Sequence, residues 1–494
     1  MSTATDQSLG QKTSSATRWN TVTQLVMKLV TPLTNMALAH ILAPEVFGIV
    51  ASITIIISFC DVFTEAGFQK YIVQHELEPD ERFDEIASVA FITNLSISFV
   101  LFLIIAAFSR QITGWIGAPG KSLALVVTAV ALPLTSFSSI QAAVYQREMN
   151  YRTLFFIRCI GTLIPVMVTI PLALLGFGYW SIVVGKLTSN LYDAIAMTWK
   201  SPWKPKLFFQ FRYLKKMLQY CTWALGESIT VWLATNVDIF IVSAVLSSYY
   251  LGIYKTSMSI VNELLRVVSS SLLPVTFSAI SRLQNDRDRF RTVCYNSQSV
   301  LSAIVLPMGV GLFMFRTLAT TIALGYQWQE ATLFIGIWSL STCISIAFSY
   351  ICDDIYRAVG KPKISFITHA INIIVLIPVV ASYAEKDFHS LIVVRSLVPL
   401  VLLIANCFAL KRETGVSMML FLLNSIPQIV ASAIMALVAY QLQKMSRDVS
   451  WQFFAILVSA TVYFGIMWLI PNGRNTLKRI LFFVARSNSE KERR

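Results

Sequence analysis

The sequence has few charged residues for its length. Only 13% of its 494 residues are Asp, Glu, Lys or Arg, whereas 55% are hydrophobic. An ordinary soluble protein carries about 25% charged residues. So few charges could not cover the surface of a soluble chain of this size, so lipid surrounds most of it. This excludes a soluble enzyme, a nucleic-acid-binding protein and a disordered scaffold, despite the net charge of +14.

The sequence also lacks the patterns of disulfide, metal and nucleotide sites. Its 7 cysteines lie within or beside apolar segments without a CxxC motif, and its 4 histidines form no HxxxH motif. The segment GWIGAPGKS at 114–122 resembles a phosphate loop, but its glycine spacing is wrong. We therefore expect no disulfide, no metal site and no enzymatic activity.

Long apolar segments dominate what is present. A helix that crosses the membrane needs about 20 mostly apolar residues, and we expect about 14 such helices in an all-α polytopic membrane protein. They cover 17–41, 45–66, 86–108, 122–145, 153–175, 179–199, 216–246, 250–281, 293–315, 329–356, 364–383, 388–410, 416–441 and 451–470. The segments 17–41 and 250–281 are the most polar, which is typical of helices that face a cavity or other helices.

The basic residues indicate the topology. With an even number of spans, both termini lie on one side of the membrane. If that side is the cytoplasm, the cytoplasmic segments hold most of the 40 Lys and Arg residues, as the positive-inside rule requires. Residues 1–16 lack the apolar core of a signal peptide. We expect both termini inside, with the basic segments 201–215 and 471–494 acting as topology determinants that could also attract anionic lipid.

Two stretches of the sequence are repeated. AHILAPEVFGIVASI around Leu42 is echoed 204 residues later by SAVLSSYYLGIYKTS around Leu246, and YQREMNYRTLFF by IYRAVGKPKISF at an offset of 210. These echoes predict two parallel six-helix halves. The expected parts are an N-terminal lobe at 1–200, a basic linker at 201–215, a C-terminal lobe at 216–411, two additional helices at 412–470 and a basic tail at 471–494.

Several cations lie within the predicted spans. They are Lys28, Arg158, Lys186, Lys255, Arg266 and Arg395. Each would cost about 2.5–3.5 kcal/mol at the centre of a helix that faces lipid, so we expect these side chains to face the protein interior. Prolines also lie within the spans, Pro165 among them. Each frees a helix carbonyl that neighbouring groups must satisfy.

Helix periodicity predicts partners for two of the cations. Glu227 and Asp238 are 11 residues apart, which is about three turns, so they share one helix face. Lys255 and Arg266 have the same spacing in the next helix. Their distances from the intervening turn match Asp238 with Lys255, and Glu227 with Arg266, as ion pairs.

The remaining cations have less obvious partners. Lys28 could pair with Asp61 by the same matching of depths from a turn. Arg158, Lys186 and Arg395 have no evident counter-ion nearby in sequence. An unpaired interior cation suggests an anionic ligand, and the alternative for each is an ion pair with an acid on another helix.

Four motifs occur in order along residues 15–410. They are ILAPEVFGIVASI, AFITN at 90–94, GFGYWSIVVG at 176–185 and NVDIFIVSAVLSSYYLGIYKTS at 236–257. This set resembles the polysaccharide-transporter branch of the multidrug/oligosaccharidyl-lipid/polysaccharide (MOP) flippase superfamily. The chain departs from that branch at Ile92, where Trp is usual, and at Ser243, where Gly is usual.

The resemblance implies a fold and a function. It implies two six-helix lobes around a central cavity, and a flippase that moves an oligosaccharide carried on undecaprenyl diphosphate across the bacterial inner membrane by alternating access, for exopolysaccharide, capsule or O-antigen synthesis. H+ or Na+ could couple to transport, and no other cofactor is expected. The implied partners are the lipid-linked oligosaccharide and membrane lipids, and could include the polysaccharide polymerase and export machinery.

The charged residues then take two expected roles. Those expected to bind the diphosphate are Arg395, Lys186, Arg158, Lys28 and Arg266. Those expected to form ion pairs at the gates are Asp61, Glu227, Asp238 and Lys255. Two alternatives share the fold: a lipid II flippase, and a cation-coupled small-molecule exporter, which would need an acidic cavity rather than a basic one. The short external loops argue against a polymerase or ligase.

Overall fold

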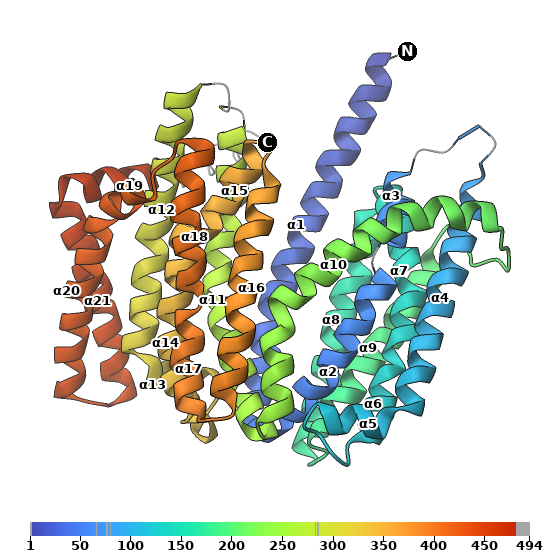
Figure 1. Ribbon diagram of the computed structural model, residues 1–494, viewed down its shortest axis with the longest axis horizontal. Helices are drawn as coiled ribbons and strands as arrows, with labels where there is room; N and C mark the ends of the chain where they lie inside the picture. The colour runs from blue at the N-terminus through green and yellow to red at the C-terminus, as the bar shows by residue number, and fades with distance from the viewer. Residues whose placement is uncertain are drawn as a thin grey trace. The chain divides into compact units, whose positions relative to one another are not determined.

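The computed structural model describes residues 2–65, 67–75, 78–79, 81–281, 283 and 286–480, and this part of the chain contains helices and no strands. The chain divides into two compact units, residues 1–252 and 253–494, and each is described by itself. The helices are labelled in Figure 1.

The first unit contains the helices from α1 to α10. They are α1 (Ser2–Ile41), α2 (Pro44–Glu65), α3 (Phe68–Gln74), α4 (Phe83–Ala107), α5 (Ser109–Trp115), α6 (Ser122–Ala129), α7 (Ala131–Arg147), α8 (Tyr151–Leu174), α9 (Tyr179–Lys200) and α10 (Phe211–Val245). The next helix, α11 (Ser248–Ser281), starts in this unit and continues in the second. Within the unit, α8 packs against α1 and α9, while α7 packs against α9 and α4.

The second unit contains the remaining helices. They are α12 (Arg287–Met314), α13 (Arg316–Ala323), the 3-10 turn η1 (Tyr326–Trp328), α14 (Ala331–Ser345), the π-helix η2 (Ile346–Tyr350), α15 (Ile351–Ala358), α16 (Pro362–Ala384), α17 (Phe388–Leu397), α18 (Pro399–Thr414), α19 (Met418–Asn424), α20 (Ile426–Met445) and α21 (Val449–Leu469). Helices α20 and α21 lie side by side, and α20 packs against α12.

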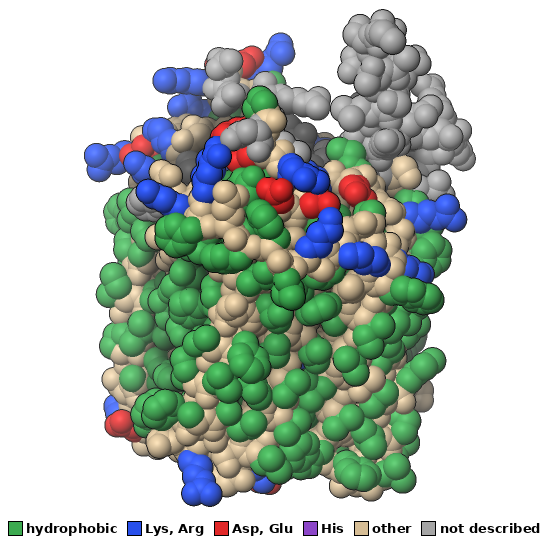
Figure 2. Space-filling view, turned by 90° about the vertical axis from the view of Figure 1, so that its right-hand side faces the viewer, with side chains coloured by type: hydrophobic (Ala, Val, Ile, Leu, Met, Phe, Trp, Pro, Cys, Tyr) green, Lys and Arg blue, Asp and Glu red, His purple; other side chains and the backbone are tan. Residues whose placement is uncertain are grey.

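The lengths and hydropathy of these helices fit a multi-pass membrane protein. In the described residues, 11 helical stretches are long and apolar enough to cross a membrane. Helices α1, α9 and α11 match three further expected spans but are more polar, so the count of fourteen stays a prediction. On the face drawn in Figure 2, apolar side chains cover most of the height and most charged side chains gather near one end. That distribution is expected of a surface embedded in lipid.

Three of the expected spans are each divided into two helices. The breaks lie at Val130, Val398 and Ser425. Two of the following helices have proline in the first turn, namely Pro399 in α18 and Pro427 in α20. Proline fits there because the first helical N–H groups have no partner within the helix.

The two copies of the Leu-Gly-Ile repeat meet each other. A Cβ atom added to Gly48 would lie 1.6 Å from the Ser248 carbonyl oxygen, and one added to Gly252 would lie 1.9 Å from the Pro44 carbonyl oxygen. Ser248 stands 204 residues after Pro44, as Gly252 does after Gly48. Each copy therefore makes the same contact on the other, which is the reciprocity that a two-fold relation produces. The contact supports the predicted repeat.

The division of the chain differs from the expected lobe boundary. We placed a linker at 201–215, whereas the division by contacts falls after Gly252. The reason is that α10 packs against α2, α4 and α3, all in the first unit. The assignment of six helices to each lobe stays a prediction.

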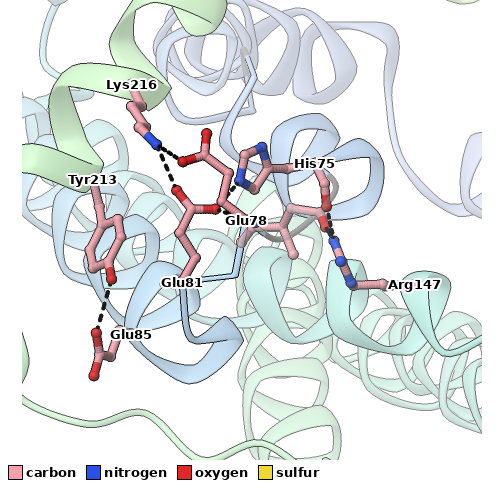
Figure 3. Close-up of polar contacts among 8 residues, drawn as sticks. His75, Glu78, Glu81, Glu85, Arg147, Tyr213 and Lys216 are labelled. Carbon is pink, nitrogen blue, oxygen red and sulfur yellow. Dashed lines mark hydrogen bonds and ion pairs between the residues drawn. The ribbon is translucent and has the colours of Figure 1, made fainter.

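An acidic loop binds the basic linker within the first unit. Figure 3 shows the cluster: the Lys216 ammonium donates to Glu78 at 2.8 Å and to Glu81 at 2.9 Å, and the His75 ring donates to Glu81 at 2.6 Å. Arg147 at the end of α7 donates to the His75 carbonyl at 2.7 Å, which closes the end of α3. The linker cations therefore have protein partners as well as their expected role in topology.

The electrostatics of this cluster centre on Glu81. Burial of its carboxyl group opposes ionisation, but the hydrogen bonds from His75 and Lys216 outweigh burial and lower the pKa of Glu81 to about 2. The same hydrogen bonds from the two glutamates raise the pKa of Lys216 above its usual value. The loop is thus held to α10 by ionised groups at neutral pH.

Candidate functional site

The first unit contains a polar cavity of about 510 Å³. Its walls come from α1, α7, α8 and α9, with one residue from α3. Its volume falls in the range of small-molecule sites, about 300–1,000 Å³. Hydroxyl and amide groups make up much of its lining; examples are Thr31, Asn35, Gln69, Ser138, Thr162 and Ser189.

Close packing of α8 and α9 shapes one wall of the cavity. A Cβ atom on Gly185 would lie 1.9 Å from the Thr169 hydroxyl oxygen, so glycine is needed for this approach. Pro165 has no N–H to donate to the carbonyl of Gly161, four residues earlier. The Ser189 hydroxyl on α9 donates to that carbonyl at 2.8 Å instead. The freed carbonyl is therefore satisfied by a neighbouring helix, as expected for a proline in a span.

Two of the predicted cations meet in this cavity. Arg158 of α8 and Lys186 of α9 both line it, together with Asp193 of α9. Asp193 lies within electrostatic range of both cations. A Cβ atom on Gly161 would lie 2.6 Å from Asp193 Oδ1, so this glycine leaves room for the carboxylate. One carboxylate cannot balance two cations, so the three side chains carry a formal charge of +1.

The three charges are close but not locked together. In the part of the chain that the structure describes, no ion pair within 4.0 Å involves Arg158, Lys186 or Asp193. The Asp193 Oδ1 atom is buried and has no hydrogen-bond partner. The cavity therefore contains polar groups whose bonding capacity a ligand could complete.

The expected pair of Lys28 with Asp61 is wrong. Lys28 is exposed on α1, and no ion pair between these two described side chains is present. Asp61 instead accepts a hydrogen bond from Thr135 of α7 at 3.5 Å. The reason is that α1 leans on α8 after the turn, whereas α2 packs against α10 and α4. Equal depth did not bring the two side chains together.

The remaining gate residues lie on α10 and α11. Asp238 is buried and Glu227 is exposed on α10. Lys255 is half-buried and Arg266 is exposed on α11. Because these two stretches belong to different units, the pairs Asp238–Lys255 and Glu227–Arg266 stay predictions.

The second unit has a basic cluster of its own. Arg395 on α17 is only 8% exposed, and its guanidinium lies 4.8 Å from the centre of the Trp338 ring. This is a cation–π contact. Tyr350, at the end of the π-helix η2, lies within electrostatic range of both Arg266 and Arg395. Single π-helical turns occur often at functional sites.

Sequence reasoning missed the position of Asp193. Lys186 and Asp193 are seven residues apart, about two helical turns, so they share a face of α9. That spacing could have placed the acid beside Lys186. It could not have shown that Arg158, on α8, faces the same cavity. Among the described residues, no group of three or more His, Cys, Asp or Glu side chains is placed to hold a metal ion.

Solved structures share this fold. The lipid II flippase MurJ in an inward closed conformation matches 91% of this chain and 98% of its own, with a TM-score of 0.73 and 16% identity. An inward-facing multidrug resistance MATE family transporter of the MOP superfamily matches 79% of this chain and 94% of its own, with a TM-score of 0.61 and 12% identity. The molecule is thus an all-α polytopic membrane protein with the MOP transporter fold, which confirms the predicted fold class.

Sequence comparison gives the family. Residues 37–333 match the family described as "Polysaccharide biosynthesis protein", and the chain belongs to it. It is therefore a member of the polysaccharide-transporter branch of the MOP superfamily, as the motifs indicated.

Two named relatives agree with this assignment. The succinoglycan biosynthesis transport protein ExoT of Rhizobium meliloti is 25% identical over 304 residues, which are 62% of this chain and 61% of that protein. The lipopolysaccharide biosynthesis protein WzxC of Escherichia coli is 19% identical over 333 residues, or 65% of each chain. The matches thus span just under two thirds of these relatives. Their names describe transport and polysaccharide synthesis, which supports a transporter rather than an enzyme.

Proposed function

We propose that the protein is a flippase for an oligosaccharide carried on a polyprenyl diphosphate, and that Arg158 and Lys186 bind the diphosphate during passage. The observation that carries this proposal is the polar cavity of the first unit, in which two cations face one carboxylate. The family links the chain to polysaccharide biosynthesis. The proposed cycle is alternating access, with H+ or Na+ as the coupling ion.

The chemistry of the cavity suits this cargo. A diphosphate cannot cross about 30 Å of hydrocarbon without compensation for its charge. Arg158 and Lys186 supply charge-assisted hydrogen bonds to phosphate oxygens. The hydroxyl and amide groups of the lining suit sugar hydroxyls. The lipid tail has no need to enter the cavity and stays in the membrane.

The alternatives are weighed by the same cavity. A cation-coupled exporter would need an acidic cavity, whereas this cavity carries a formal charge of +1 from its three charged residues. A lipid II flippase would carry the same diphosphate group, and the resemblance to the MurJ structure, at 16% identity, concerns the fold alone. Membership in a polysaccharide biosynthesis family favours an oligosaccharide precursor of an exported polymer.

The test replaces the cavity cations without changing side-chain length greatly. Arg158→Gln and Lys186→Gln are made singly and together in the full chain, and polymer export is measured in cells whose own transporter gene is deleted. Loss of one charge-assisted hydrogen bond costs about 1.5–3 kcal/mol, so each single variant should bind a short-chain polyprenyl diphosphate about 10–100-fold more weakly. The double variant should export no polymer and should accumulate complete lipid-linked units on the cytoplasmic face.

Arg152→Gln is the matched control. Arg152 lies on the same helix as Arg158 but is exposed and does not line the cavity. It should export normally. Normal export by the double variant, at wild-type protein levels, would refute the assignment of the diphosphate to this cavity. Rescue of a lipid II flippase deletion instead of polymer export would select the alternative cargo.

A further inference from the structure

A second pocket lies in the second unit and is not used by the proposed function. It has a volume of about 170 Å³. One wall is the helix at residues 471–480, which follows α21. This helix contributes Asn472, Asn475, Thr476 and Arg479, whose spacing places them on one helix face. The opposite wall consists of Tyr295, Asn296 and Ser299 of α12 and Asn424 at the end of α19.

The helix is fixed in place by its other face. Leu477 and Ile480 pack against the buried cluster formed by α12, α20 and α21. A Cβ atom on Gly473 would lie 2.4 Å from the Met467 carbonyl oxygen, so the start of the helix lies tightly against the end of α21. Thr476 is buried and shares a hydrogen bond of 3.0 Å with Ser299. The polar face is therefore held against α12 rather than exposed to solvent on all sides.

The lining of the pocket has the chemistry of an anion site with additional hydrogen-bonding groups. Arg479 supplies a guanidinium, and the asparagines supply amide donors and acceptors. The Tyr295 hydroxyl accepts from the Ser417 amide at 2.9 Å, so its own proton can be donated to a ligand. No Asp or Glu lines the pocket. The volume corresponds to about five or six water molecules, which is room for a phosphate group and part of its substituent.

The surroundings indicate a position at the edge of the membrane. Beside Asn424, the side chains of Leu423 and Ile426 are 47% and 48% exposed. Arg474 and Lys478 are exposed on the helix that forms the pocket. Apolar side chains that face acyl chains, next to cations that face headgroups, are typical of the boundary between hydrocarbon and water.

We propose that this pocket binds the headgroup of an anionic phospholipid, with the phosphodiester on Arg479 and small polyol hydroxyls on the asparagine amides. The acyl chains lie along the exposed apolar side chains of α19 and α20, which Leu423 and Ile426 represent. A phospholipid fits better than a soluble phosphate, because the pocket opens where this apolar surface begins. This site is independent of the cavity in the first unit.

The experiment measures lipid binding to the purified full chain by native mass spectrometry. Phosphatidylglycerol, which carries a phosphodiester and a glycerol, is titrated against phosphatidylcholine in detergent. The wild type should bind one phosphatidylglycerol at least 10-fold more tightly than phosphatidylcholine. Arg479→Gln should lose most of that preference. Arg474→Gln removes one charge from the same helix outside the pocket and should change the affinity less than 2-fold.

Further arms separate the other outcomes. Equal loss in Arg474→Gln and Arg479→Gln would overturn the proposal in favour of diffuse attraction to basic residues. Equal binding of both lipids by the wild type would also overturn it. Displacement of the lipid by millimolar glycerol 3-phosphate would assign the pocket to a soluble phosphate. If Arg479→Gln does not fold, Asn475→Asp provides the test, because an exposed carboxylate at the pocket should repel the phosphate and weaken binding at least 5-fold.

Discussion

Replacing Ser189 by Ala should destabilise the first unit by removing one hydrogen bond between helices. The Ser189 hydroxyl donates at 2.8 Å to the buried carbonyl of Gly161, which the missing N–H of Pro165 leaves without its helical partner. A buried carbonyl left unpaired costs about 1–3 kcal/mol. Alanine fills nearly the same volume as serine, so the packing term is small. We therefore expect Ser189→Ala to lower the free energy of unfolding by about 1–3 kcal/mol.

A second substitution isolates this cause. Pro165→Ala restores a backbone N–H that can donate to the Gly161 carbonyl within α8. In that background the carbonyl has a partner without Ser189. Ser189→Ala should then cost less than about 0.5 kcal/mol, and the double-mutant cycle should give a coupling energy of about 1–2 kcal/mol. Thr188→Val is the control, because the Thr188 hydroxyl bonds only to Val184 of its own helix.

The cycle is measured by denaturant unfolding of the purified protein in detergent, followed by tryptophan fluorescence. Thr188→Val should stay within about 0.5 kcal/mol of the wild type. An equal cost of Ser189→Ala in both backgrounds would show that the Gly161 carbonyl does not depend on this hydroxyl. The account of how α8 tolerates its proline would then be wrong.

Three further predictions follow from contacts in the first unit. The pKa of Glu81 is lowered to about 2, so its contribution is present above the unfolded value near 4.5 and is lost as the pH falls toward 2; about 2 kcal/mol should disappear between pH 6 and pH 3 in the wild type but not in Glu81→Gln, as unfolding measured across that range would show. Gly252→Ala should cost about 1–3 kcal/mol in the same unfolding assay because its Cβ would meet the Pro44 carbonyl, whereas Gly226→Ala, with open space around its Cβ, should not destabilise. Asp193→Asn should bind a diphosphate analogue about 3–10-fold more tightly in a binding titration, because it removes the only carboxylate in the cavity lining; weaker binding would contradict the proposed balance of charges.

The membrane architecture follows largely from local sequence properties. The apolar run that became α4 needs lipid around it wherever it lies, and the repeat around Leu42 and Leu246 is visible without coordinates. The motifs predicted the family to which the chain belongs. The cost of a charge in lipid required Arg158 and Lys186 to face the interior. These inferences depend on composition and on distances along the chain, which the sequence contains.

The grouping of charges was decided by tertiary packing. Helix periodicity places Lys186 and Asp193 on one face, but Arg158 joins them only because the glycines of α8 and α9 let these helices approach closely. Periodicity likewise gave Lys28 and Asp61 equal depth, yet α1 and α2 lean on different helices and the pair does not form. A helical sequence determines which side chains share a face and how deep they lie, whereas the neighbour that this face meets depends on how all the helices pack together.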